Sequence, residues 1–199
     1  GDRYEGTWLN GIRSGQGVCR YADGSEYEGT WVDDKWHEKG ELTSKLGDVY
    51  VGDFIGGKQH GEGEVTFHDG TYFSGTWRSG RRNGFGKCDF ANRDVYVGKW
   101  KADLQCGNGS WKSASGASYV GGWNKGIKSG EGRYEDANGD VYQGQWKDDK
   151  RHGQGTCQYK SGETYEGEWQ FDYRWGLGKG QVYQGFPPAY AYDYNGRWK

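Results

Sequence analysis

One glycine returns along this chain at a constant interval of 23 residues. Each copy lies between two aromatic side chains, one placed two residues before the glycine and one two residues after it. The glycines are Gly6, Gly29, Gly52, Gly75, Gly98, Gly121, Gly144 and Gly167. A fixed interval held over eight units is the signature of a repeat protein, in which each unit packs only against its neighbours.

Each repeat has the pattern of one β-hairpin. In the segment 27–31, YEGTW, every second residue is an aromatic ring or a glycine, which is typical of a β-strand with one buried face. A G-x-G segment follows in most repeats, as at Gly61 and Gly63, and its glycines leave room for the rings of a facing strand. Turn dipeptides such as Asp23-Gly24 separate the repeats. Glu38 and Arg93 are the exceptions in these glycine columns.

The chain is therefore predicted to be all-β, an elongated single-layer solenoid or rod of consecutive antiparallel β-hairpins, one per 23-residue repeat. We expect one array over residues 1–199: eight repeats from about 4 to 187, an irregular insert at about 184–193, and a partial ninth repeat at 194–199. The 11 Trp and 16 Tyr supply apolar surface that the few aliphatic residues do not. The chain contains no Met, and we expect it to be a fragment of a longer protein.

Three elements together, Tyr-Glu-Gly-x-Trp, Gly-x-Gly and Asp-Gly at a 23-residue spacing, resemble the MORN (membrane occupation and recognition nexus) repeat. The segments YEGEW at 165–169 and HGQG at 152–155 match its consensus closely. The resemblance covers the whole chain, with Phe54 and Phe73 as departures at ring positions. It implies a cytoplasmic scaffold that organises protein assemblies near membranes or the cytoskeleton. It also implies that catalysis, where a relative has any, lies in a separate domain.

Cysteines and histidines fall in repeat columns and do not cluster. Cys19, Cys88 and Cys157 recur every three repeats, which is about 30 Å along a straight rod and too far for a disulfide. We predict that they are small core residues in a reducing, intracellular compartment. A column before G-x-G holds His37, His60, Cys106 and His152. Adjacent members of this column are about 10 Å apart, so only two chains side by side can pair them around a metal.

No catalytic residue, cofactor or intramolecular metal site is predicted, and no nucleic acid partner is expected. The loop inside each hairpin is often basic and the loop between repeats is often acidic, although the net charge is only -2. The basic edge suits anionic lipid headgroups, each Lys or Arg adding roughly 1 kcal/mol near a membrane surface. The candidate residues are Lys58, Arg81, Arg82, Lys150 and Arg151.

Acidic residues interrupt this basic edge, so we expect phosphoinositide binding to be weak and firm docking to mixed membranes to be absent. The interrupting residues are Asp33, Asp34, Asp103, Asp148 and Asp149. Two other interpretations of the charges stay open. Opposite edges of two rods can pair with each other, or the charges can simply be solvated turns.

The C-terminal end departs from the 23-residue register. Pro187 and Pro188 interrupt the pattern, which resumes at 194–198, 29 residues after the preceding copy. Aromatic residues also occupy loop positions that are polar or basic in most repeats, and exposed rings of this kind are enriched at protein interfaces. We predict an antiparallel homodimer interface. Its residues are Phe171, Tyr173, Trp175, Phe186, Tyr190, Tyr192 and Tyr194.

These features favour a non-enzymatic, self-associating scaffold with cytoskeletal or membrane-associated protein partners. The alternative is a peripheral module that binds phosphoinositide or other anionic headgroups. An extracellular carbohydrate- or choline-binding repeat is a third interpretation, because such proteins also use hairpins rich in Trp and Tyr. It is disfavoured here, since the ring columns face glycines and do not form exposed cages.

Overall fold

A computed structural model describes the backbone of residues 1–184 and 190–198, and the side chains up to residue 181. It contains two compact units, Gly1–Leu104 and Gln105–Lys199. All regular structure in the described residues is β. Among these residues, there is no helix long and apolar enough to cross a membrane.

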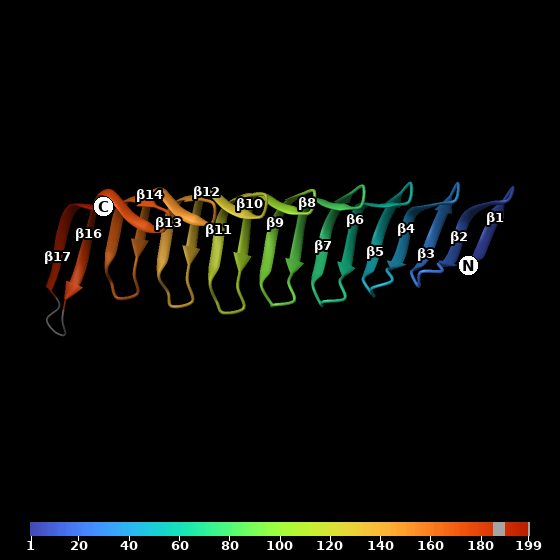
Figure 1. The fold of residues 1–199 in the computed structure, drawn as a ribbon, viewed down its shortest axis with the longest axis horizontal. Helices are drawn as coiled ribbons and strands as arrows, with labels where there is room; N and C mark the ends of the chain where they lie inside the picture. Colours follow the sequence, from blue (N-terminus) through green and yellow to red (C-terminus); the bar gives the residue numbers. More distant parts are fainter. Residues whose placement is uncertain (185–189, 199) are drawn as a thin grey trace. The chain divides into compact units, whose positions relative to one another are not determined.

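The first unit is a single antiparallel sheet in which each strand pairs with its neighbours in the sequence (Figure 1). Its strands alternate between seven and nine residues. They are β1 (Arg3–Leu9), β2 (Ile12–Arg20), β3 (Glu26–Val32), β4 (Lys35–Thr43), β5 (Val49–Ile55), β6 (Lys58–Thr66), β7 (Tyr72–Arg78), β8 (Arg81–Asp89) and β9 (Val95–Lys101).

The second unit has the same pairing of sequence neighbours. Its strands are β10 (Leu104–Lys112), β11 (Ser118–Asn124), β12 (Ile127–Glu135), β13 (Val141–Lys147), β14 (Lys150–Gln158), β15 (Thr164–Gln170), β16 (Tyr173–Gln184) and β17 (Tyr190–Trp198). The first residue of β10, Leu104, is the last residue of the first unit. β16 has 12 residues, whereas the other even-numbered strands have nine. It lies at the C-terminal end, where the sequence departs from the 23-residue repeat. The predicted fold class, all-β with one hairpin per 23-residue repeat, is confirmed.

Two-residue turns close the hairpins. Both residues of such a turn have a positive φ, as at Asn10 (51°) and Gly11 (78°), which is the type I′ geometry that matches the twist of paired strands. In each unit the hairpin tips therefore lie along one edge of the sheet and the loops between repeats along the other. These edges are at the top and the bottom of Figure 1, respectively.

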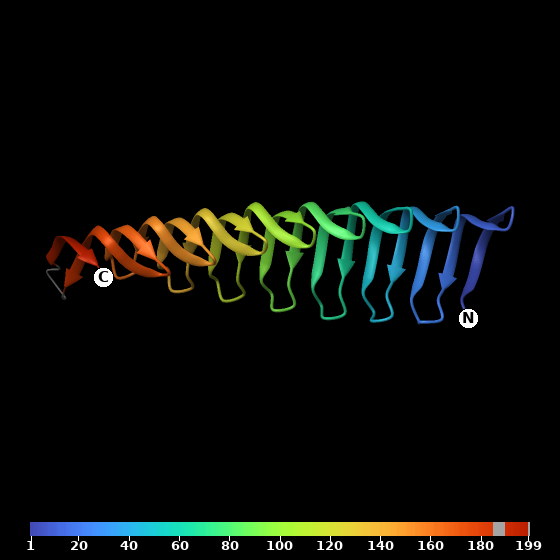
Figure 2. The same cartoon turned by 45° about the horizontal axis from the view of Figure 1, so that its top comes forward.

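The even-numbered strands bulge where they contain the G-x-G segment. In the second repeat, Gly29 pairs with Gly40 while Thr30 pairs with His37, so two residues of β4 have no partner in β3. A bulge bends a strand, and Figure 2 shows the hairpins of both units bending over toward their tips. The first bulged residue is Glu38, with a φ of 51°, at a position that is glycine in the other repeats.

This backbone conformation predicts that Glu38→Gly stabilises the protein. A left-handed conformation strains a residue that has a Cβ, so we expect the free energy of unfolding to rise by about 1 kcal/mol. Glu41→Gly is the matched control, because Glu41 lies in the same strand with an ordinary conformation and should lose about 0.5–1 kcal/mol. Denaturant midpoints of the two variants measure the difference. Shifts of the same sign would contradict the prediction.

Aromatic rings of the odd-numbered strands build the core on one face of each sheet. The Tyr50 hydroxyl donates to the Asp53 carbonyl at 3.0 Å, which holds the ring over the facing glycines. The Tyr50 ring centroid lies 5.0 Å from Phe54 of its own repeat and 5.1 Å from Trp77 of the next, both edge-to-face. The Trp77 indole N–H donates to the Gly63 carbonyl at 3.0 Å. Ring contacts thus continue from repeat to repeat within a unit.

Two departures from the repeat pattern lie opposite each other. Glu38, the residue that replaces a glycine, pairs directly with Phe54, the residue that replaces a tryptophan. In the preceding repeat the equivalent pair is Gly15 with Trp31. The glycine does not set the room for this ring, because a Cβ on Gly15 would meet Thr7 and not Trp31. The smaller Phe54 instead accompanies Trp36, whose ring centre lies 5.7 Å from its own in a column that holds Arg, Lys or Gln in the other repeats.

Candidate interaction surfaces

A clamp of one cation and one carboxylate joins the tips of successive hairpins. Arg13 Nε lies 2.8 Å from Asp34 Oδ1, and the Arg13 backbone N–H donates to the same oxygen at 3.0 Å. The guanidinium lies 4.2 Å from the centre of the Trp31 ring. The hydrogen bond from the Arg13 side chain holds the pKa of Asp34 below its ordinary value. The clamp fastens the tip of the second hairpin to the first repeat.

The same clamp joins Arg82 to Asp103 and Arg151 to Asp172, each with an Nε–Oδ1 distance of 3.3 Å. The sequence pattern alone had presented Asp34 and Asp103 as interruptions of a basic edge. The structure shows that they are partners of arginines 21 residues earlier in the chain. The recurring 21-residue separation of Arg and Asp was the sequence signal that could have revealed the clamp.

The clamp also divides the predicted headgroup-binding residues into two sets. The guanidinium of Arg82 lies 4.3 Å from the centre of Trp100, and that of Arg151 lies 4.3 Å from the centre of Trp169. These two arginines are therefore engaged within the fold. The other three candidates, Lys58, Arg81 and Lys150, are exposed at the starts of their strands.

One hairpin tip in the first unit carries two arginines that face each other. Arg78 pairs directly with Arg81 across the turn between β7 and β8. Neither guanidinium has a carboxylate partner within the part of the chain that the structure describes. Like charges directly opposite each other on paired strands are destabilising, so an anion near this tip would relieve their repulsion.

An exposed apolar patch lies at the last hairpin of the second unit, and we call it the β16 patch. It consists of Phe171 in the turn and three alternate residues of β16, Tyr173, Trp175 and Leu177. Their exposed fractions are 44%, 76%, 44% and 68%, respectively. The sequence pattern did not single out Leu177. Its column holds the polar residues Gln16, Lys39, Glu62 and Gln154 but also the exposed Phe85, so the signal in the sequence is weak.

The remaining residues of the predicted dimer interface are only partly described. Phe186 lies outside the described residues. Tyr190, Tyr192 and Tyr194 belong to β17, where their backbones pair with Gln184, Val182 and Gly180 of β16, respectively. Their side chains are not among those described, so the structure brings together only the first three predicted residues.

The cysteine column is buried, as predicted. Cys19 and Cys88 are 0% exposed, Cys157 is 2% exposed, and all are free thiols. Burial raises the pKa of the Cys88 thiol to about 11, which keeps it protonated and unreactive at neutral pH. Within the described residues, no three His, Cys, Asp or Glu side chains gather to hold a metal ion.

Consecutive antiparallel hairpins with ring and glycine columns define this chain as a β-hairpin repeat protein. The family model for the MORN repeat matches it in eight consecutive segments, and the chain belongs to the MORN repeat family. The matched residues are 4–26, 27–49, 50–72, 73–95, 96–118, 119–141, 142–164 and 165–179. The irregular C-terminal segment follows the last match.

No curated protein sequence matches the chain. Among solved structures, the wild-type TCP10 domain of Danio rerio CPAP is similar with a TM-score of 0.50 and 9% identity, covering 100% of this chain and 96% of that chain. The Drosophila melanogaster SAS-4 (dCPAP) TCP domain in complex with a proline-rich motif of Ana2 has a TM-score of 0.47 and 10% identity, covering 92% and 90%. At these identities the likeness concerns the fold alone.

Proposed function

We propose that this chain is a non-enzymatic scaffold that self-associates as an antiparallel homodimer through its C-terminal repeats. In this role it organises a protein assembly at the cytoskeleton or beside a membrane in the cytoplasm. Membership of the MORN repeat family supports the scaffold role. The β16 patch is the observation that supports self-association.

The β16 patch differs from the same positions of the preceding repeat. Tyr173, Trp175 and Leu177 occupy the columns that hold Lys150, His152 and Gln154 one repeat earlier. Single exposed apolar residues are common on any surface, but three in a row beside an exposed Phe form a continuous patch. Covering such a patch removes apolar surface from water and favours association.

A second copy of the chain is the occupant that this patch suits. A two-fold axis sets a surface against itself, so charged groups near the axis would meet their own kind. The four side chains of the β16 patch carry no charge. Arg174 lies between Tyr173 and Trp175 in the strand, but its guanidinium is on the ring face of the sheet, 4.9 Å from the centre of Tyr165. The next cation on the strand, Lys179, lies 3.3 Å from Glu166 and is balanced by it. Aromatic anchors buried at an interface often contribute more than about 2 kcal/mol each.

The test replaces the patch with residues that the fold already accepts. Tyr173→Lys, Trp175→His and Leu177→Gln together reproduce the preceding repeat, so the variant is expected to fold. We expect light scattering at several concentrations to show dimers of the unaltered chain and monomers of the triple variant. Loss of two anchors predicts a dissociation constant at least about 100-fold higher.

Ile127→Lys is the control for this test. Ile127 occupies the same column as Tyr173 two repeats earlier, is 38% exposed and lies outside the patch. This variant should dimerise like the unaltered chain. A monomeric unaltered chain at all concentrations, or a triple variant that dimerises equally well, would refute the proposed dimer.

A second candidate function is weak binding of anionic lipid headgroups, favoured by the facing Arg78 and Arg81 with Lys58 on the adjacent tip. We expect a soluble inositol phosphate to bind there with an affinity that falls as salt rises. Arg78→Gln with Arg81→Gln should weaken this binding at least about tenfold without changing the circular dichroism spectrum. Arg82 is unsuitable for the test because it belongs to a clamp. Equal binding by the double variant would exclude this site.

A further inference from the structure

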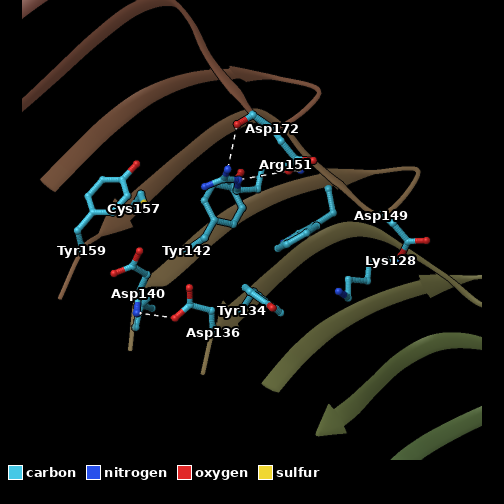
Figure 3. Close-up of a pocket in the computed structure, with 12 residues that line it drawn as sticks. Lys128, Tyr134, Asp136, Asp140, Tyr142, Asp149, Arg151, Cys157, Tyr159 and Asp172 are labelled. Carbon is cyan, nitrogen blue, oxygen red and sulfur yellow. Dashed lines mark hydrogen bonds and ion pairs between the residues drawn. The ribbon is translucent and has the colours of Figure 1, made fainter. Parts of the chain in front are cut away.

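A hollow of about 440 Å³ opens on the ring face of the second unit, between its successive repeats (Figure 3). Three tyrosines line it, namely Tyr134 of β12, Tyr142 of β13 and Tyr159, which follows β14. Burial raises the pKa of the Tyr134 and Tyr159 hydroxyls, so these side chains stay neutral at physiological pH. The tyrosines therefore give the hollow uncharged ring surfaces, which suit a flat or cationic group.

Acidic residues outnumber basic residues in the lining of this hollow. Arg151 is paired with Asp172 in a clamp. Lys128 is matched by Asp149, which accepts the Lys128 backbone N–H at 2.9 Å and attracts its ammonium group. Asp136 and Asp140 also line the hollow, and neither forms an ion pair within the described part of the chain. The hollow thus holds two carboxylates in excess of its cations.

The two unbalanced carboxylates lie next to each other, as Figure 3 shows. Asp136 Oδ1 accepts backbone N–H groups from Asn138, Gly139 and Asp140 at 2.8–3.0 Å. Asp140 Oδ1 accepts the Lys160 backbone N–H at 2.8 Å. These bonds fix both side chains in place and use only one oxygen of each. The second oxygen of each, Oδ2, has no hydrogen-bond partner among the described residues and can accept a further donor.

The fold itself shows that ring surfaces at this hollow hold cations. The Lys128 ammonium lies 4.8 Å from the centre of Tyr134, 5.3 Å from Trp146 and 5.4 Å from Tyr119. The Arg174 guanidinium lies 5.2 Å from the centre of Tyr159. Lys128 is at the far end of the hollow from the two carboxylates in Figure 3.

We propose that this hollow binds the guanidinium group of an arginine from a partner protein. The planar group would lie against the tyrosine rings and donate to the free oxygens of Asp136 and Asp140, the geometry that arginine adopts with carboxylates. The partner is thus an extended, arginine-containing segment. The inference is independent of the proposed dimer, because the hollow uses none of the four residues of the β16 patch.

An equivalent hollow of about 350 Å³ in the first unit provides an internal comparison. Leu42, Ser44 and Phe67 take the places of Tyr134, Asp136 and Tyr159. Of its two carboxylates, Asp103 is paired with Arg82 in a clamp, and Asp48 is already bonded to His68 and Ser44. It therefore lacks the paired free carboxylates, and we expect it to bind arginine far more weakly.

The test is a titration of ¹⁵N-labelled chain with the peptide acetyl-Gly-Arg-Gly-amide, followed by nuclear magnetic resonance. The amides of Asn138, Gly139 and Asp140 report directly on Asp136, because they donate to its carboxylate. We expect saturable shifts of these amides. The neutral peptide in which citrulline replaces arginine should bind at least about tenfold more weakly, and so should the variant Asp136→Asn with Asp140→Asn. Both substitutions keep the Oδ1 acceptor that the fold uses.

A gain of binding is the complementary test. Leu42→Tyr with Ser44→Asp should give the first unit a second site, with new saturable shifts around Gly47. Equal binding of the citrulline peptide would overturn the inference, as would unchanged binding by the Asn variant. Saturable shifts of the same amides with inorganic phosphate in place of the peptide would show an anion site and would also overturn it.

Discussion

Gly52→Ala is expected to destabilise the first unit by about 3 kcal/mol or more, although it adds a single methyl group. A Cβ on Gly52 would lie 2.5 Å from the Gly63 Cα and 2.7 Å from the Glu62 carbonyl oxygen. Both are backbone atoms of the paired strand β6, so relief requires the two strands to separate. The Tyr50 hydroxyl, 2.6 Å from the same point, would also be displaced.

Gly47→Ala is the matched control for this prediction. Nothing lies within 4 Å of a Cβ at Gly47, but its φ is +89°. The control variant therefore suffers backbone strain without a clash, and we expect it to lose about 1 kcal/mol. Denaturant unfolding monitored by tryptophan fluorescence compares the two variants. Equal losses would mean that close contact between the glycines of neighbouring strands is not what the repeat requires.

Trp31→Ala is expected to lose about 3–5 kcal/mol of the free energy of unfolding. The Trp31 side chain is 1% exposed, and its indole N–H donates to the Gly17 carbonyl at 3.1 Å. Its ring centre lies 5.2 Å from Tyr27 and 4.2 Å from the Arg13 guanidinium. Removing this side chain therefore opens a cavity, leaves the Gly17 carbonyl without its donor and exposes the Arg13 guanidinium of the clamp.

Trp8→Ala removes the same residue type from the same column of the first repeat. Trp8 is 55% exposed, because the described chain places no repeat before it. We expect this variant to lose about 1–2 kcal/mol. Thermal unfolding followed by circular dichroism measures both variants. A loss for Trp8→Ala as large as that for Trp31→Ala would show that contacts between repeats contribute little.

Much of the fold was predictable because its signals are local. Alternate rings and glycines within five residues predict a strand with one buried face, as at Tyr27, Gly29 and Trp31. A constant 23-residue interval predicts that each hairpin packs against its neighbours. The cysteine column was also predictable, since positions three repeats apart cannot meet in a chain of consecutive hairpins.

The candidate sites were less predictable because they depend on what lies beside each residue in space. In the sequence, Arg82 and Arg151 look like members of a basic edge. In the structure, each forms an ion pair with an aspartate of the following hairpin tip. In the sequence, Leu177 is a single apolar residue among polar and glycine neighbours. In the structure, it belongs to the four-residue β16 patch. Asp136 and Asp140 become a pair only because the turn between β12 and β13 folds one onto the other.

The sequence by itself determined the repeat length, the hairpin in each repeat and the buried columns. It could do so because these follow from side-chain alternation and from steric room at glycine. The tertiary structure alone decided which charges are neutralised, which Trp of a column is buried and where carboxylates lie without cations. Those properties depend on residues of neighbouring turns, strands and repeats, whose distances and orientations are set by how successive hairpins bend and pack.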